Sequence, residues 1–134
     1  MGITLKIGEF EAEALYDSRD TQVACESVEH YDAPVNSCDD NSNTIMITGT
    51  KWNNFVREVG LDDLFLGEYG LSERVDTAGA LTAKHLERFE QAQEAHVPDL
   101  NEDGEDYVKR RLDWLVYWTT WALKYCEYPT FVIT

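Results

Sequence analysis

Apolar and polar side chains alternate in residues 3–16 in the manner of a β-strand. Ile3, Leu5 and Ile7 share one face of the extended chain, and after Gly8 the apolar positions move to the other face. This change of parity predicts a bulge or a sharp bend at Gly8. Glu, Ala and Leu in the same segment also permit a helix, but the strict alternation favours a strand.

The next stretch carries weaker patterns. Residues 21–31 are compatible with a strand, whereas residues 32–43 are rich in the Pro, Asn, Asp and Ser of turns and loops. Residues 44–48, TIMIT, form a short and mostly apolar run. Such a run predicts a strand in the interior of a sheet.

The clearest local unit is a helix over residues 51–59, with Thr50 as its N-cap. Its apolar residues recur at the spacing of one helix face: Trp52, Phe55, Val56 and Val59. Gly60 and Leu61 then predict a Schellman ending. Residues 61–80 contain glycines and scattered apolar side chains, which predict an irregular, partly packed loop.

Two further helices follow. Thr82 is the expected N-cap of a helix over residues 83–96, with Leu86, Phe89 and Ala92 facing inward and Pro98 beyond its end. The last helix is expected over residues 105–127. It is apolar on most sides, which is typical of a central core helix, and residues 131–134 then predict a final strand.

The order of these elements predicts one compact α+β domain spanning residues 1–134. A small antiparallel sheet, made of N-terminal strands and the C-terminal strand, should pack against about three helices. The last helix should be central and rich in aromatic residues.

Charge narrows the classes of partner. The chain has 26 Asp and Glu against 11 Lys and Arg, which gives a formal net charge of −15. Nucleic acid and anionic membranes have the same sign, so direct binding to either is not expected. A basic protein partner, a cation or a high-salt habitat is compatible with this charge.

The acidic excess is largest in the first forty residues. If the strand continues through residues 9–13, its glutamates form a row spaced about 6.6 Å apart. Such a row would suit Lys and Arg on a partner, although an ordinary solvated face explains it as well. The predicted partner-binding residues are Glu9, Glu11, Glu13, Asp17, Asp20, Glu26 and Glu29.

The segment PDLNEDGED at residues 98–106 resembles the start of a calcium-binding loop. Arg110 occupies the closing position, where a bidentate Glu is needed, and a cation there would repel calcium. The same letters are typical of a helix start, with Asp103 or Asn101 as the N-cap. No metal site and no cofactor are therefore predicted.

Large rings accumulate in the last helix, and some of them are candidates for a ligand pocket or an interface. The pocket residues predicted on this basis are Trp114, Trp118, Trp121 and Tyr125, together with Arg57 and Arg74. A nucleotide-like anion would need an arginine in this pocket, with Arg110 and Arg111 as further candidates. The apolar stretch 112–126 is shorter than the roughly 20 residues needed to span a bilayer.

No pattern recommends catalysis. The chain has no glycine-rich phosphate loop, no nucleophile elbow and no HExxH, and His30, His85 and His96 are dispersed. Three cysteines, Cys25, Cys38 and Cys126, leave one unpaired in any disulfide scheme. With no signal-peptide pattern at the start, these features predict a reduced, cytoplasmic protein.

Three functions fit the sequence. The first is a small acidic protein of the immunity or anti-defence type, viral or cellular, that inhibits a basic protein, such as one that binds nucleic acid, by mimicking its polyanion. The second is a protein that binds or sequesters a small anionic ligand in an aromatic-lined pocket. The third is a structural subunit without catalytic activity, and the sequence leaves a homo-oligomer open.

Overall fold

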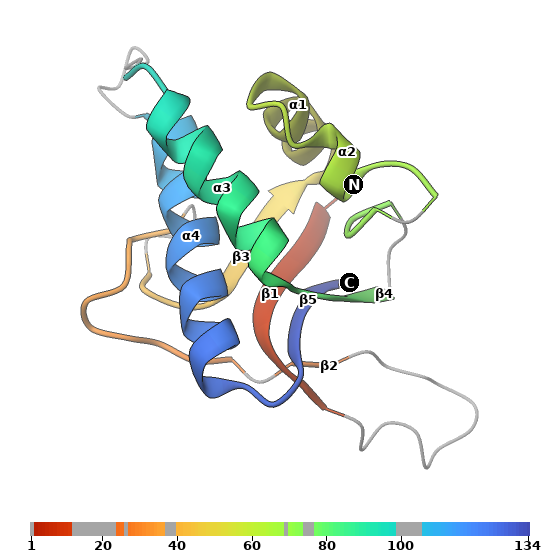
Figure 1. Ribbon diagram of the computed structural model, residues 1–134, viewed down its shortest axis with the longest axis vertical. Helices are drawn as coiled ribbons and strands as arrows, with labels where there is room; N and C mark the ends of the chain where they lie inside the picture. The colour runs from red at the N-terminus through yellow and green to blue at the C-terminus, as the bar shows by residue number, and fades with distance from the viewer. Residues whose placement is uncertain are drawn as a thin grey trace.

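The computed structural model describes residues 2–11, 24–25, 27–36, 40–68, 70–73, 77–98 and 106–134. The strands are β1 (Gly2–Glu11), β2 (Ala24–Cys25), β3 (Thr44–Thr48), β4 (Thr77–Ala80) and β5 (Pro129–Ile133). The helices are α1 (Gly49–Glu58), α2 (Asp62–Phe65), α3 (Ala83–Ala95) and α4 (Tyr107–Tyr125). The predicted α+β class is confirmed, and Figure 1 shows α3 and α4 side by side over one face of the sheet.

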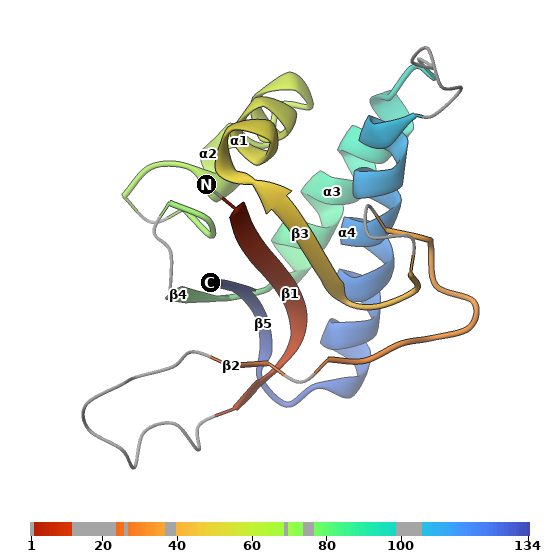
Figure 2. The ribbon, with the colours of Figure 1, turned by 180° about the vertical axis from the view of Figure 1, so that it is seen from behind.

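The sheet is antiparallel and built around β1. β3 pairs with the first half of β1 on one side, and β5 pairs with β1 on the other side and carries β4 beyond it. β2 pairs with the far end of β1. The final strand predicted at 131–134 is confirmed as β5, which places both ends of the chain in the sheet (Figure 2).

β3 corrects the expectation of an internal strand. Within the described residues, β3 pairs with β1 alone and so lies at an edge of the sheet. Ile45 and Ile47 are buried, but Met46 between them is 64% exposed. The apolar run TIMIT therefore has one buried face and one open face, as an edge strand allows.

Gly8 does not form the predicted bulge, because β1 pairs with β5 residue by residue from Leu5 to Glu9. A glycine is needed at this position for another reason. A Cβ added at Gly8 would lie 2.6 Å from the Sγ atom of Cys25, closer than atoms approach one another. The position thus needs glycine for the close passage of β2.

α1 begins two residues earlier than expected. The side chain of Thr48, not that of Thr50, accepts a hydrogen bond from the Lys51 amide at 3.2 Å. The predicted Schellman ending is confirmed: Gly60 has a φ of 73°, and the Leu61 amide donates to the carbonyl of Val56 at 2.8 Å.

The irregular, partly packed loop expected at 61–80 is correct for part of its length only. It contains α2 and the edge strand β4. The apolar residues Leu61, Phe65 and Leu71 are buried in the core, so they anchor the segment to the rest of the fold.

α3 has the predicted N-cap at Thr82. The Thr82 side chain accepts from the His85 amide, and the Thr82 amide donates to Nδ1 of His85 at 3.0 Å. Burial lowers the pKa of His85, which favours the neutral ring that this acceptor role requires.

α4 is capped by Asp106 in place of the expected Asp103 or Asn101. One carboxylate oxygen of Asp106 accepts from the Lys109 amide at 2.9 Å, and the other lies 2.8 Å from Nε2 of His96. The end of α3 and the start of α4 are therefore tied together. Residues 99–105, including most of the calcium-like loop, lie outside the described residues.

Candidate functional site

The aromatic residues of α4 divide between the core and the surface. Trp114 and Trp118 are fully buried, so they do not line the pocket that was predicted for them. Trp114 donates from Nε1 to the carbonyl of Ser42 at 3.1 Å. Trp121 is half-buried and Tyr125 is 66% exposed, and these two do face a groove.

This aromatic groove, of about 550 Å³, runs along the outer side of α4. It is lined by Pro34, Gln93, Asp113, Val116, Tyr117, Thr120, Trp121, Lys124 and Tyr125. Its lining acid, Asp113, already accepts from Gln93 at 2.8 Å and from Lys109 at 2.6 Å. Lys124 is the one cation among the lining residues, and no arginine lines it.

A second feature ties the segment after β2 to α4. The hydroxyl of Tyr117 donates to Asp32 at 3.2 Å and lies 2.9 Å from Nδ1 of His30. Burial and the neighbouring Asp32 carboxylate raise the pKa of Tyr117, so the phenol stays protonated. The imidazole of His30 packs on Trp118 with ring centroids 4.7 Å apart. These contacts give His30 a packing role.

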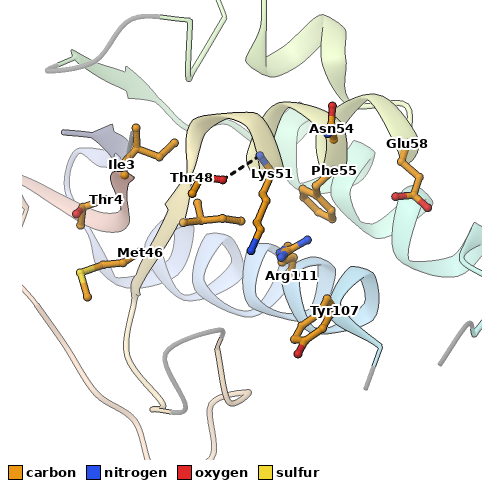
Figure 3. A pocket seen from close by; sticks show the side chains of 12 residues that line it. Ile3, Thr4, Met46, Thr48, Lys51, Asn54, Phe55, Glu58, Tyr107 and Arg111 are labelled. Carbon is orange, nitrogen blue, oxygen red and sulfur yellow. Dashed lines mark hydrogen bonds between the residues drawn. The ribbon is translucent and has the colours of Figure 1, made fainter. Parts of the chain in front are cut away.

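The larger groove lies between α1, the start of β1 with the end of β3 that pairs with it, and the first turns of α4 (Figure 3). Its volume is about 990 Å³. It is lined by Gly2, Ile3, Thr4, Met46, Ile47, Thr48, Lys51, Asn54, Phe55, Glu58, Tyr107 and Arg111. We call it the basic groove, because its described lining holds two cations, Lys51 and Arg111, and one carboxylate, Glu58.

Arg111 is held in this groove by aromatic rings. Its guanidinium carbon lies 5.7 Å from the ring centroids of both Phe55 and Tyr107, within cation–π range. Burial lowers the pKa of Arg111, and the charge of Glu58 opposes that effect. No hydrogen bond or ion pair joins its side chain to another described residue, and its Nε atom is buried without a partner.

Of the two arginines predicted for the pocket, the structure describes Arg57 alone. Arg57 is exposed near the end of α1 and lines neither groove, and Arg74 lies outside the described residues. Among the candidate arginines that the structure describes, Arg111 is the one that lines either groove, and that groove differs from the aromatic one expected. Lys51 was missed because nothing in its local sequence marks it.

The predicted acidic set is only partly described. The side chain of Glu11 and all of Glu13, Asp17, Asp20 and Glu26 lie outside what the structure describes. Glu29 is exposed. Glu9 has an internal role, because its carboxylate accepts from the amides of Glu127 and Tyr128 at 2.9 and 2.6 Å. It fastens the turn between α4 and β5 to β1.

A different acidic row lies on the solvent face of α3. Glu87, Glu90 and Glu94 are exposed and follow one another at three- and four-residue spacing, which places them on one side of the helix. Arg88 does not neutralise them. It points to α2, where it donates to both carboxylate oxygens of Asp63 at 2.8 and 2.7 Å and to the carbonyl of Gly60.

Two further findings concern metals and membranes. Among the residues with described positions, no three His, Cys, Asp or Glu side chains gather as a group that could hold a metal ion. No helix in the same parts of the chain combines the length and apolarity needed to cross a membrane.

The arrangement therefore offers two distinct surfaces for binding, an acidic helix face and a basic groove. Comparisons with protein-family models, with curated proteins and with solved structures find no match to this chain.

Proposed function

We propose that this chain is a small, cytoplasmic, non-enzymatic binding protein that inhibits or sequesters a basic protein. Its partner would be one whose basic surface ordinarily meets a polyanion, such as nucleic acid, so that the carboxylates of this chain compete for that surface. The single observation that carries the proposal is the exposed acidic row on α3, formed by Glu87, Glu90 and Glu94, with which Arg88 makes no ion pair.

The energetics of that row support a role in binding. Like charges three or four residues apart on a helix destabilise it by about 0.2–0.5 kcal/mol per pair. Arg88 sits within the row in sequence, yet it is directed away to Asp63 and Gly60. A row that stability alone does not favour is well suited to Lys and Arg on a partner, and it would speed association with that partner.

The N-terminal acids can extend this surface only in part. Glu29 is exposed and stays a candidate for contact with the partner. Glu9 is a weaker candidate than the sequence suggested, because its carboxylate is already engaged by two backbone amides. The centre of the proposed interface therefore moves from the first strand to α3.

The test is capture of partners from the native host, or from infected cells if the source is viral. Wild-type protein should retain a basic protein in a pull-down at low salt and release it at high salt, because exposed charges are screened within about 3 Å at 1 M salt. The triple variant Glu87→Lys, Glu90→Lys, Glu94→Lys should retain none of it.

A matched control separates the α3 row from general acidity. The variant Glu68→Gln, Glu73→Gln, Glu127→Gln changes three exposed acids away from α3 and should capture the same protein as wild type. Equal losses in a Glu87→Gln, Glu90→Gln, Glu94→Gln variant and in this control would show that the position of the charges is irrelevant. Capture of only neutral or acidic proteins would contradict the proposal itself.

A second candidate function is binding of a small anionic ligand. The observation that favours it is the basic groove, where Arg111 and Lys51 lie in an otherwise acidic chain. The aromatic groove is less suited to an anion, since Lys124 is its one lining cation and Asp113 lies in the same wall.

A further inference from the structure

The basic groove joins charges that lie far apart in the sequence. Lys51 comes from the first turn of α1 and Arg111 from the second turn of α4. Figure 3 shows both side chains among those that line the groove. Two cations that line one groove favour an anion there.

Neither cation is satisfied within the described part of the chain. The side chains of Lys51 and Arg111 take part in none of the ion pairs there, whereas Arg88 and Lys109 each pair with an aspartate. Glu58 lines the same groove but makes no ion pair with Arg111 in those residues. The planar fork of an arginine matches the oxygens of a carboxylate or a phosphate, which makes such a headgroup the fitting partner.

Arg111 is also prearranged for this task. The rings of Phe55 and Tyr107 hold its guanidinium at 5.7 Å on two sides. A charged group fixed before a ligand arrives loses little conformational freedom on binding, so more of the interaction contributes to affinity.

Part of the remaining lining is apolar and accepts the body of an organic molecule. Ile3 and Ile47 come from the paired strands, and Met46, which is 64% exposed, lies at the groove edge. The volume of about 990 Å³ falls within the ~300–1,000 Å³ of small-molecule sites. A groove lined by both cations and apolar side chains is suited to an amphiphilic ligand.

We propose that the basic groove binds a small organic anion, whose carboxylate or phosphate headgroup lies between Arg111 and Lys51 and whose apolar body packs on Ile3 and Met46. This site does not rest on the proposed partner binding, because the α3 row contributes none of its lining. Glu58 opposes the ligand by charge and so limits its affinity.

Three probes with the same benzyl body test the site: benzyl alcohol, phenylacetate and benzyl phosphate. Amide NMR titrations should give dissociation constants of about 1 mM or tighter for at least one of the two anions. Benzyl alcohol should bind at least about tenfold more weakly, because it lacks the charge that Arg111 and Lys51 recognise. The shifts should concentrate at the start of α1, the first turns of α4 and β3, and the two anions distinguish a carboxylate ligand from a phosphate ligand.

Variants assign the contacts. Arg111→Met retains a side chain that packs on aromatic rings, and Lys51→Gln alters an exposed residue that leaves the fold intact. Each should weaken binding of the preferred anion by about tenfold or more. Glu58→Gln should strengthen it by about twofold or more, since it removes the opposing charge.

The matched control is Arg57→Met, which removes an exposed positive charge from α1 outside the groove and should leave the affinity unchanged. Equal weakening by Arg57→Met would reduce the effect to net charge and overturn the site. The inference also fails if benzyl alcohol binds as tightly as the anions, if neither anion binds at millimolar concentration, or if the shifts cluster at the aromatic groove.

Discussion

Two arginines in this molecule lie in opposite surroundings. At the corner between α2 and α3, Arg88 donates to both carboxylate oxygens of Asp63 and to the carbonyl of Gly60, and Asp63 raises its pKa. In the basic groove, Arg111 is half-buried between two rings, and burial lowers its pKa. The first arginine is satisfied by its own chain, and the second is not.

The difference shows how a strongly acidic chain distributes its charge. Because Arg88 pairs with Asp63 at the corner, it does not pair with the three exposed glutamates of α3. In the basic groove the balance is reversed, with two cations against Glu58. The net negative charge of the chain therefore agrees with the local charge on the exterior of α3. It does not reveal the two cations in the basic groove.

Ligand binding should separate the two arginines most strongly. Arg111→Met should weaken the preferred benzyl anion by about tenfold or more. Arg88→Met, the same substitution at the corner, should change that affinity by less than about twofold, because Arg88 lies outside the groove lining. Titrations of both variants check this, and a larger loss in Arg88→Met than in Arg111→Met would reverse the comparison.

Stability should respond in the opposite sense. Arg88→Met removes a bidentate ion pair at the surface and should lower the free energy of unfolding by up to about 1 kcal/mol. Arg111→Met exchanges an unsatisfied, half-buried charge for a side chain that packs on rings, and it should leave stability unchanged or raise it by up to about 1 kcal/mol. Urea denaturation measures both; a clear destabilisation by Arg111→Met alone would mean that its charge is structurally required.

Acidification should reduce the stability that the Arg88–Asp63 pair contributes at the corner between α2 and α3. The hydrogen bond from Arg88 lowers the pKa of Asp63 below its ordinary value of 3.8. A lowered pKa contributes stability above the unfolded value, and that contribution is lost as the pH falls from about 4 through the folded pKa. In Arg88→Met the pKa of Asp63 should return toward 3.8, so the dependence of unfolding free energy on pH should be shallower below about pH 4. Identical acid profiles for the two proteins would remove Asp63 from the account.

The smallest effect is expected on the α3 face. Glu90→Gln relieves repulsion from Glu87 and Glu94 and should raise the free energy of unfolding by about 0.2–0.5 kcal/mol for each of these two pairs. The gain should shrink in high salt, because exposed charges are screened. A loss of stability at low salt would show that Glu90 makes a favourable contact, and the row would then have a structural explanation.

Local signals in the sequence predict much of the helical part of the fold. The stripe from Trp52 to Val59, the glycine at 60 and the cap at Thr82 depend on neighbours within a few residues, and the structure keeps them. β4 could not be predicted in this way. Its TAGA sequence has no apolar periodicity, and it becomes a strand by pairing with β5.

The aromatic stripe of α4 marks the limit of periodicity. Trp114, Trp118, Trp121 and Tyr125 share one helix face, but only the first two are in the core. The spacing of apolar residues predicts which residues share a helix face. Only the packing of other elements decides which residues of that face are buried.

The two binding surfaces also differ in whether local spacing in the sequence reveals them. The row at Glu87, Glu90 and Glu94 can be recognised in the sequence from its helical spacing. The partner-binding residues were instead predicted near the N-terminus, because the acidic excess is largest there. Lys51 and Arg111 line the same groove only because α1 and α4 lie at the same end of the sheet. No local pattern links two residues so distant in the chain.

The most direct measurement of the central claim is the affinity of the captured basic partner at two salt concentrations. Between about 0.1 and 0.5 M salt, wild-type protein should lose at least about tenfold in affinity, because the α3 carboxylates act through exposed charge. The Glu87→Gln, Glu90→Gln, Glu94→Gln variant should bind more weakly and lose less on addition of salt. An affinity that stays the same at both salt concentrations in wild type would contradict the account.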